Sequence, residues 1–267
     1  MTAIAVTIAG SDSGGGAGIQ ADLKTFSAFG VYGASVITAL TAQNTRGVTA
    51  IHPVPAEFVT AEIDAVFSDL KVDAVKIGML GGPEVIAAVA DGLDRWRQRR
   101  VVLDPVMVAA SGDQLVADES VAFIRDQLIP RAMVVTPNLP EAARLLGLPV
   151  AADRAAMEAQ AKQLLALGPH AVLIKGGHAG GPESADFLLT AVSKRWLVAP
   201  RFATNNTHGT GCTLSSAIAA GLAQGRHLEA AVIAAKDYLT AAIAAADRLH
   251  IGGGRGPVHH FHKWWKV

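Results

Sequence analysis

Cysteine is almost absent from the sequence, and Cys212 is the single residue of this type. One cysteine cannot form a disulfide within the chain, which is typical of a reducing compartment and leads us to expect a cytoplasmic location. Long apolar runs are also missing, and none approaches the ~20 residues that a membrane-spanning helix needs. The first residues have no basic segment and run directly into Gly10-Ser11-Asp12, which predicts a strand and not a signal peptide.

An excess of either charge is missing as well, since 23 Lys and Arg residues balance 23 Asp and Glu residues. A neutral chain has no field that would attract nucleic acid or an anionic membrane, so we expect neither as a partner. What the sequence does have is 267 residues with 51 % hydrophobic content and no linker-like segment. These features favour one domain over residues 1–267.

Apolar strand-like runs alternate with segments of helical spacing along most of the chain. We expect strands at 3–9, 31–40, 72–80, 101–103, 133–135 and 171–175, with a hairpin at 185–190 and 194–199. We expect helices at 19–26, 55–70, 83–98, 153–167 and 227–248, and further helices that begin near 138 and 210. Phe58 should face inward on its helix, and Pro83 suits a first helical position. This alternation predicts a three-layer α/β fold around a mostly parallel sheet.

The stretch from Thr204 to Ser216 organises the candidate site. Gly209-Thr210-Gly211-Cys212 stands directly before a run of small apolar residues, which predicts a tight turn that opens into a buried helix. The free N–H groups and the dipole of such a helix start favour an anion. At this position the pKa of the Cys212 thiol should fall below ~8.5. The alternative is a simple helix cap with a buried cysteine.

Other polar residues follow the predicted strands. The glycine-rich loop from Gly10 suits close approach of the backbone to a ligand, or it is only a flexible connector. Gln43 leaves its strand for a loop, where its amide could read a heterocycle edge that carries an amino group beside a ring nitrogen, or could merely stabilise the loop. Asp104 ends a strand at the place where parallel sheets bind ligands, or it caps a turn.

Three further residues, Asn138, Glu141 and Lys175, suggest metal and phosphate binding. Asn138 and Glu141 are three residues apart at a helix start, a spacing that suits the water shell of Mg²⁺ and equally a capping box. Lys175 leaves a strand into two glycines and could lie along a phosphate chain. The tail around His259, His260 and His262 is poor evidence for a metal site, and its tryptophans favour docking onto the body of the protein.

Taken together these motifs resemble one family. They are Thr7–Asp12, Gln20–Thr25, Ala42–Gly47, Lys76–Leu80, Thr136–Ala142, Lys175–His178, Asn206–Cys212 and the Gly256–His262 tail. The likeness spans nearly the whole chain and is to the hydroxymethylpyrimidine/phosphomethylpyrimidine kinases of thiamine biosynthesis, within the ribokinase superfamily. It implies a ribokinase-like domain, expected to be a homodimer, that uses Mg²⁺ and ATP. Such an enzyme phosphorylates 4-amino-5-hydroxymethyl-2-methylpyrimidine and then the monophosphate.

The resemblance also implies roles for individual residues. Gln43 would read the pyrimidine edge, in a pocket lined by Gly10, Asp22, Met79 and Val106. Asn138 and Glu141 would hold the Mg²⁺ shell with Asp104 nearby, and Lys175 would lie beside the ATP phosphates.

The turn from Gly209 through Thr210 and Gly211 would be the anion hole, and Cys212 would replace the aspartate base that is more usual in the superfamily. That replacement leaves the identity of the base open. The rival interpretations are a pyridoxine/pyridoxal kinase of the same superfamily and a nucleotide-binding regulator without catalysis.

Overall fold

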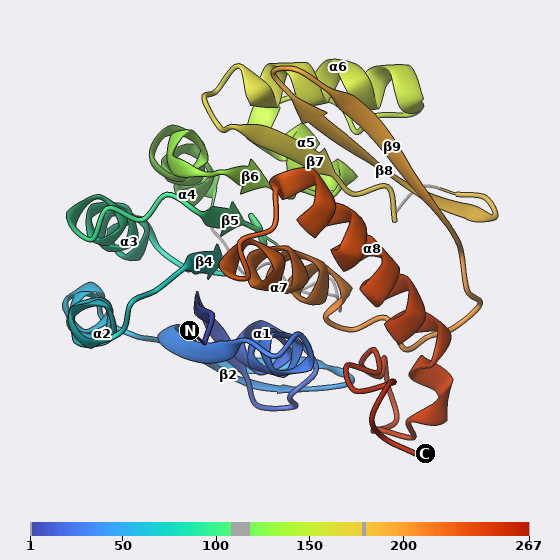
Figure 1. Ribbon diagram of the computed structural model, residues 1–267, viewed down its shortest axis with the longest axis horizontal. Coiled ribbons are helices and arrows are strands. Elements are labelled where there is room, and N and C mark those ends of the chain that lie inside the picture. Colours follow the sequence, from blue (N-terminus) through green and yellow to red (C-terminus); the bar gives the residue numbers. More distant parts are fainter. Residues whose placement is uncertain (1, 108–117, 178–179, 267) are drawn as a thin grey trace.

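A nine-stranded sheet with the order β3-β2-β1-β4-β5-β6-β7-β8-β9 runs through the computed structural model (Figure 1). The structure describes residues 2–107, 118–177 and 180–266, so His178 of the predicted strand-end motif lies outside the described residues. The strands are β1 (Ile4–Asp12), β2 (Tyr32–Asn44), β3 (Gly47–Pro53), β4 (Ala74–Ile77), β5 (Val101–Leu103), β6 (Val134–Val135), β7 (Ala171–Ile174), β8 (Glu183–Thr190) and β9 (Lys194–Pro200).

The centre of the sheet is parallel and its two margins are antiparallel. β2, β1, β4, β5, β6 and β7 pair in parallel, in that order. β3 pairs antiparallel with β2, and β8 and β9 form an antiparallel hairpin beside β7. The predicted mostly parallel sheet is therefore confirmed. Because the parallel strands share one direction, their carboxyl ends meet at one edge of the sheet.

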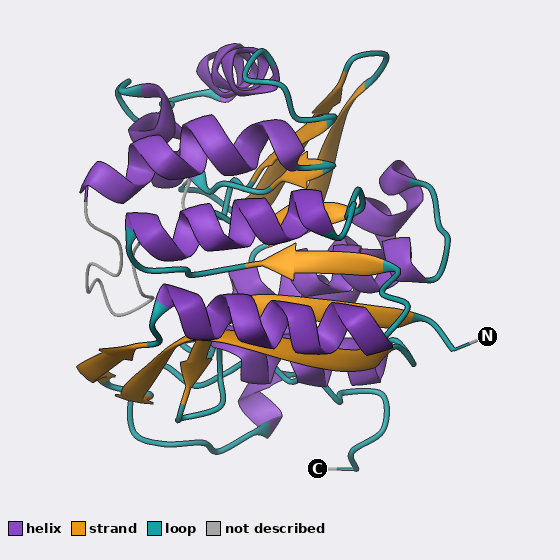
Figure 2. Cartoon of the chain, turned by 90° about the vertical axis from the view of Figure 1, so that its left-hand side faces the viewer, coloured by secondary structure: helices purple, strands orange, loops and turns teal. Residues whose placement is uncertain are grey.

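Helices cover both faces of the sheet and complete the three predicted layers (Figures 1 and 2). The helical segments are α1 (Gly18–Ala28), α2 (Ala56–Asp69), α3 (Pro83–Arg95), α4 (Asp118–Phe123), η1 (Ile124–Leu128), η2 (Ile129–Arg131), α5 (Leu139–Leu146), α6 (Arg154–Leu165), α7 (Thr210–Ala223), α8 (Leu228–Ala244) and η3 (Ala246–Arg248).

Two buried apolar clusters define the layers. One joins α2, α3, α5 and α6 to alternate strand residues such as Leu103 and Ile174. The other joins α1, α7 and α8 to the opposite strand faces, where Val102 and Leu173 lie. Successive strand residues point to opposite faces, so a strand buried on both sides is apolar throughout. The continuous apolar runs of the sequence follow from this arrangement.

The structure corrects several local expectations. β2 continues through Asn44 and turns back into β3, so Gln43 lies in a strand and not in a loop. Phe58 is exposed on α2, although we expected it to face inward. The helical stretch from Asp118 to Arg131 was not predicted at all. Among the described residues, none of the helices is both long and apolar enough to cross a bilayer.

Candidate active site

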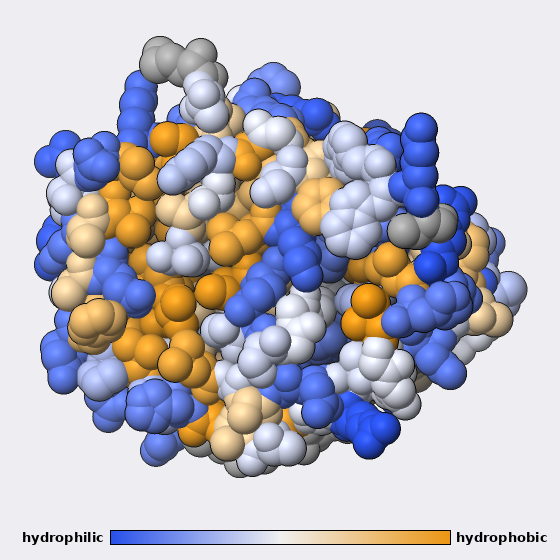
Figure 3. All heavy atoms as spheres, turned by 90° about the horizontal axis from the view of Figure 1, so that it is seen from below, coloured by the Kyte–Doolittle hydropathy of each residue, from blue (hydrophilic) through white to orange (hydrophobic). Residues whose placement is uncertain are grey.

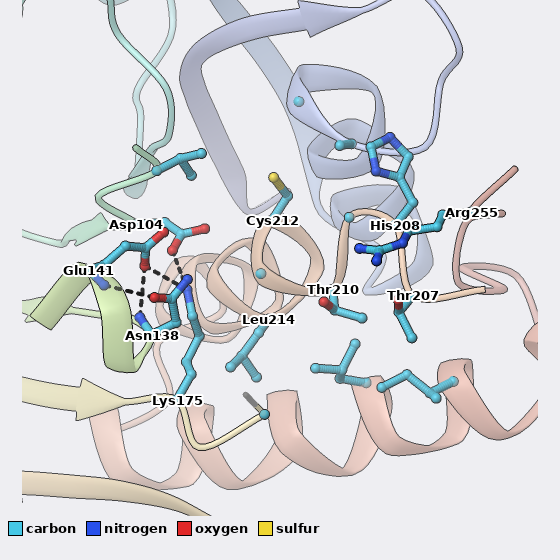
Figure 4. A pocket seen from close by; sticks show the side chains of 18 of the residues that line it. Asp104, Asn138, Glu141, Lys175, Thr207, His208, Thr210, Cys212, Leu214 and Arg255 are labelled. Atoms are coloured by element: carbon cyan, nitrogen blue, oxygen red, sulfur yellow. Dashed lines mark hydrogen bonds and ion pairs between the residues drawn. The ribbon is translucent and has the colours of Figure 1, made fainter. Parts of the chain in front are cut away.

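A cavity of about 940 Å³ opens at the carboxyl ends of the parallel strands and at the start of α7. Its lining brings together twelve of the thirteen predicted site residues: Gly10, Gln43, Met79, Asp104, Val106, Asn138, Glu141, Lys175, Gly209, Thr210, Gly211 and Cys212. Figure 4 shows the charged group around Lys175 at one end of the cavity and His208 with Arg255 at the other, with Cys212 between them.

The N-terminus of α7 forms the middle of the cavity wall. Gly209 is the residue before the helix and has a φ of 78°, a left-handed conformation that favours glycine. A Cβ atom at this position would lie 2.0 Å from the carbonyl oxygen of Gly16, so the two loops pack backbone against backbone. The first N–H groups of a helix have no partner within it, and the residues that carry them here line the cavity.

A compact charged cluster lies beside this helix start. The Nζ atom of Lys175 is 2.6 Å from Oδ1 of Asp104 and 3.8 Å from Oε2 of Glu141. Burial alone would lower the pKa of Lys175, but the two carboxylates outweigh it and raise this pKa. A Cβ atom on Gly211 would lie 3.4 Å from both Lys175 Nζ and Asp104 Oδ2. The ammonium group and the helix start therefore approach the same small volume.

Asn138 and Glu141 form a capping box at the start of α5. The Asn138 side chain accepts from the Glu141 N–H, and the Glu141 carboxylate accepts from the Asn138 N–H. The capping interpretation of this spacing is therefore confirmed. Burial raises the pKa of the Glu141 carboxyl to about 7, with Lys175 opposing the rise. The cap leaves Glu141 on the cavity wall beside Lys175.

The metal-ligating capacity of this cluster is limited. No group of three or more His, Cys, Asp or Glu side chains in the described ranges is arranged to hold a metal ion. Asp104 already accepts hydrogen bonds from Lys175, Thr136 and Ser215. The carboxylates of Asp104 and Glu141 nevertheless fit Mg²⁺. Proteins commonly bind this ion through one or two carboxylates together with phosphate oxygens and water.

Gln43 and Gly10 lie on the other side of the α7 start. Oε1 of Gln43 is 3.0 Å from Oγ1 of Thr41, and its Nε2 is 3.5 Å from Nε2 of His208. The amide is thus held from both sides at the cavity wall. A Cβ atom on Gly10 would lie 2.4 Å from the Met79 methyl group, so glycine at this position leaves room for that side chain.

Asp22 does not line the cavity, which corrects its predicted place in the substrate pocket. Its carboxylate is fully buried behind the wall and accepts hydrogen bonds from Thr7, Ser216 and Lys76 at 2.6, 2.6 and 2.8 Å. Lys76 is also fully buried, yet it reaches the floor of the cavity. The carboxylate therefore holds a buried ammonium group below Cys212.

The thiol of Cys212 is not activated in the way that its position at a helix start suggests. Burial raises its pKa to about 11, although the Lys76 ammonium acts in the opposite direction. The expectation of a pKa below ~8.5 was wrong because it counted the helix dipole and omitted desolvation and the neighbouring carboxylates.

Two side-chain pairs at the cavity, one hydrogen-bonded and one an ion pair, were missed in the sequence. Nε2 of His208 is 2.8 Å from Oδ2 of Asp12, and the two oxygens of this carboxylate accept from three backbone N–H groups of the glycine-rich loop. Lys236 of α8 pairs with Asp186 at 2.7 Å, and Asp186 accepts from the N–H of Gly176. Each pair joins residues far apart in the chain, so no local pattern could have revealed it.

Comparisons with known proteins agree with this geometry. The family model for phosphomethylpyrimidine kinase matches residues 12–259. The hydroxymethylpyrimidine/phosphomethylpyrimidine kinase of Rhizobium meliloti (strain 1021) is 64 % identical over 266 residues, which cover 100 % of both chains. A crystal structure of phosphomethylpyrimidine kinase from Clostridium difficile 630 superposes with a TM-score of 0.80 at 44 % identity, over 90 % of this chain and 99 % of that one. The ADP complex of Bacillus subtilis pyridoxal kinase has a TM-score of 0.90 at 36 % identity, over 97 % of this chain and 98 % of that one.

Proposed function

The chain belongs to the phosphomethylpyrimidine kinase family, and from this premise we propose how its cavity performs the reaction. The protein is a phosphotransferase that moves a phosphoryl group from ATP to 4-amino-5-hydroxymethyl-2-methylpyrimidine, and then a second one to the monophosphate. The observation that carries the proposal is the approach of Lys175 and Asp104 to Gly211, on the same cavity as Gln43. The residues proposed to bind ATP and the residue proposed to bind the acceptor therefore lie around the same helix start.

Phosphoryl transfer depends on position and charge neutralisation more than on covalent help from the protein. In our proposal the transferring group lies against the turn of Gly209, Thr210 and Gly211, whose N–H groups donate to its oxygens. Lys175 lies beside the phosphate chain of ATP. Asp104, Asn138 and Glu141 hold Mg²⁺ largely through water, and when bound this ion neutralises charge on the phosphates.

The acceptor occupies the other side of the helix start. The Gln43 amide offers a donor and an acceptor side by side, which match the amino group and adjacent ring nitrogen of the pyrimidine. Gly10, Met79 and Val106 surround the ring, and the hydroxymethyl group then points toward Cys212 and the anion hole. Asp22 acts from behind the wall through Lys76 and has no direct contact with the ring in this proposal.

The test is mass spectrometry of the products formed from ATP and the pyrimidine. We expect the monophosphate to appear first and the diphosphate to follow. A parallel reaction with pyridoxal tests the alternative that the protein is a pyridoxal kinase. An enzyme that phosphorylates pyridoxal and leaves the pyrimidine unchanged would contradict the proposal, and so would a protein that consumes no ATP.

We further propose that the enzyme is a cytoplasmic homodimer in which residues 1–267 act as one domain. Apolar side chains that are 45–58 % exposed on β2, β3 and α2 support the dimer: Tyr32, Leu40, Ile51 and Phe58. Figure 3 shows apolar surface on this side of the molecule. Light scattering should give the mass of a dimer, and Ile51→Glu should give that of a monomer. A wild-type protein that stays monomeric at micromolar concentration would contradict the dimer.

A further inference from the structure

A second, more polar groove opens beside the acceptor side of the cavity. Its volume is about 540 Å³, and it shares Gln43, Asn205, His208 and Arg255 with the larger cavity. Its other walls come from the β2–β3 turn, including Arg46, and from the glycine-rich segment that precedes the tail. The groove is thus a side branch of the acceptor site and not a separate depression on the surface.

Close backbone contacts build this branch. The N–H groups of Arg255 and Gly254 donate to the carbonyl and hydroxyl oxygens of Thr45, at 2.8 and 3.1 Å. A Cβ atom on Gly254 would lie 2.1 Å from that carbonyl oxygen, so the close approach depends on glycine. The Arg46 N–H donates to the Asn44 side chain at 2.8 Å. The backbones of both arginines are therefore fixed where the two segments meet.

The branch has the charge of an anion site. A Cβ atom on Gly253 would lie 3.2 Å from a guanidinium nitrogen of Arg46, which places that group over the glycine-rich wall. Figure 4 shows the Arg255 guanidinium group beside His208, at the junction with the main cavity. None of the described residues that line the branch is acidic. Guanidinium groups bind phosphate through paired N–H donors, so a phosphate monoester suits this lining.

The proposed reaction sequence generates such a ligand. The first transfer breaks the bond from the γ-phosphorus to the β–γ bridging oxygen of ATP and forms a bond to the hydroxymethyl oxygen, which loses its proton. The neutral alcohol thereby becomes a monoester with a charge of about −1.5 to −2. ADP has to leave and a new ATP has to bind before the second transfer. During that exchange the monoester must be retained or captured again from solution.

We propose that Arg46 and Arg255 form a holding site for the phosphate of the pyrimidine monophosphate, next to the ring site at Gln43. This inference rests on the proposed function and adds to it a site that distinguishes the two acceptors by charge. The ring stays near Gln43, on the wall that the two cavities share, while the phosphate lies in the arginine-lined branch. The site limits escape of the intermediate between the two transfers, and the phosphate moves to the start of α7 for the second one.

The experiment compares the two acceptors in the wild type, Arg46→Gln, Arg255→Gln and the double variant. We expect the ratio of the dissociation constant of the monophosphate to that of the alcohol to rise at least tenfold in the double variant. More monophosphate should also accumulate in solution before the diphosphate appears. Arg255→Lys, which keeps the charge, should restore part of the wild-type ratio. Arg226→Gln, at an exposed arginine after α7, is the matched control.

The outcomes separate the two proposals. A ratio of the two dissociation constants that stays within twofold of wild type, including an equal loss of affinity for both acceptors, overturns the holding site. A wild-type enzyme that phosphorylates neither acceptor overturns the proposed function instead. Thermal unfolding of each variant identifies a folding defect. If the double variant has one, the single variants that remain folded are titrated with the monophosphate instead. Unchanged affinity in that titration also overturns the holding site.

Discussion

At the scale of single residues, burial and then the nearby charges determine the pKa of the Cys212 thiol. Lys76 and Lys175 favour its thiolate, whereas Asp22 and Asp104 disfavour it. Burial adds the largest contribution and raises the pKa of the thiol to about 11. At pH 7 only about 10⁻⁴ of the molecules would carry the thiolate. The residue is therefore a half-buried, protonated thiol on the cavity wall.

Alkylation measures this pKa directly, because Cys212 is the only cysteine. The thiolate is the reactive form, so the rate with iodoacetamide should rise about tenfold per pH unit from pH 7 to pH 10. Asp22→Asn removes a neighbouring anion and should shift the profile to lower pH, whereas Lys76→Met should shift it to higher pH. If both variants shift the pH profile in the same direction, Asp22 and Lys76 affect the thiol through the folded structure and not through their charges. A plateau below pH 9 would contradict the raised pKa.

Replacement of Cys212 by alanine tests whether the thiol is a general base. The alcohol must lose a proton during attack, whereas the monophosphate is already largely a dianion at neutral pH. Because the thiol is protonated, we expect Cys212→Ala to slow both half-reactions by similar factors, through the shape of the anion hole. Each acceptor is supplied alone and its initial rate is measured. A loss at least tenfold larger for the alcohol would assign the base to Cys212.

Gln43 should determine affinity for the acceptor and leave ATP unaffected. Gln43→Leu removes two hydrogen bonds and leaves a polar ring edge unpaired, which should cost about 1–3 kcal/mol of binding. Equilibrium titration with the pyrimidine measures the loss, and titration with ATP is the internal control. Thr41→Val should have a smaller effect, because Thr41 contacts the Gln43 amide at 3.0 Å and only helps to orient it. Unchanged pyrimidine affinity in Gln43→Leu would exclude the assignment.

At the scale of elements, α7 offers two glycines in nearly the same conformation with different surroundings. Gly209 precedes the helix with a φ of 78°, and Gly225 follows it with a φ of 80°. A Cβ atom on Gly209 would lie 2.0 Å from the Gly16 carbonyl oxygen, whereas one on Gly225 would have nothing within 4 Å. The pair therefore separates backbone strain from loss of the loop contact.

We expect Gly225→Ala to lower the free energy of unfolding by about 1–2 kcal/mol and to keep activity, because only the left-handed backbone is strained. Gly209→Ala should lower the free energy of unfolding by about 1–3 kcal/mol more, because the added methyl group overpacks the contact, and it should also abolish most of the activity. Urea unfolding and initial rates measure both effects. Similar stability and activity in the two variants would show that the contact between Gly209 and Gly16 is unimportant.

The elements that the sequence predicted well are those with a local physical cause. Pro83 begins α3 as expected, since a proline lacks the N–H group that a first turn leaves unpaired. The central strands are apolar throughout because helices cover both of their faces. β3 was missed because most of its side chains are exposed at the sheet edge and carry no burial pattern. Phe58 fits the apolar stripe of α2 but lies on the face proposed to meet a second subunit.

The site was predictable where each residue follows a strand or opens a helix. Asp104, Lys175 and Gly209 lie on the cavity because parallel strands end at one edge of the sheet. Asp22 could not be placed in the same way. Whether a helical carboxylate faces a ligand or a buried lysine depends on a residue 54 positions away, Lys76. Spacing along the chain contains no information about that contact.

At the scale of the whole molecule, the C-terminal tail supports the anion hole. The His208 N–H donates to the Gly256 carbonyl oxygen at 3.0 Å, which attaches the tail to the loop before α7. Oγ1 of Thr213 donates to the Gly209 carbonyl oxygen at 2.8 Å and lies 3.1 Å from Nε2 of His260. Since the hydroxyl proton is already donated, neutral His260 serves as the donor through Nε2. The tail docks through its buried histidines and not, as the sequence suggested, through its tryptophans, because Trp264 and Trp265 are 53 and 51 % exposed.

The acid stability of the protein should depend on this histidine. Burial, with Lys24 and His259 nearby, lowers the pKa of His260 to about 3, whereas the unfolded chain titrates near 6.5. Below pH 6.5 the unfolded chain binds a proton that the folded protein does not, so stability falls as the pH decreases toward 3. The free energy of unfolding should therefore drop by about 2 kcal/mol from pH 7 to pH 5 through this group alone.

His260→Phe removes the titrating group, so its stability should decline less steeply over this pH range, although it is less stable than wild type at pH 7. Urea unfolding at half-unit pH steps measures both profiles, and His250→Phe, at an exposed position, accounts for the loss of one histidine elsewhere. The rate of phosphoryl transfer should follow the same trend, because release of the tail frees Thr213 and the loop at Gly209. Profiles for His260→Phe and wild type that run parallel from pH 7 to pH 5 would show that the tail remains docked when His260 is protonated.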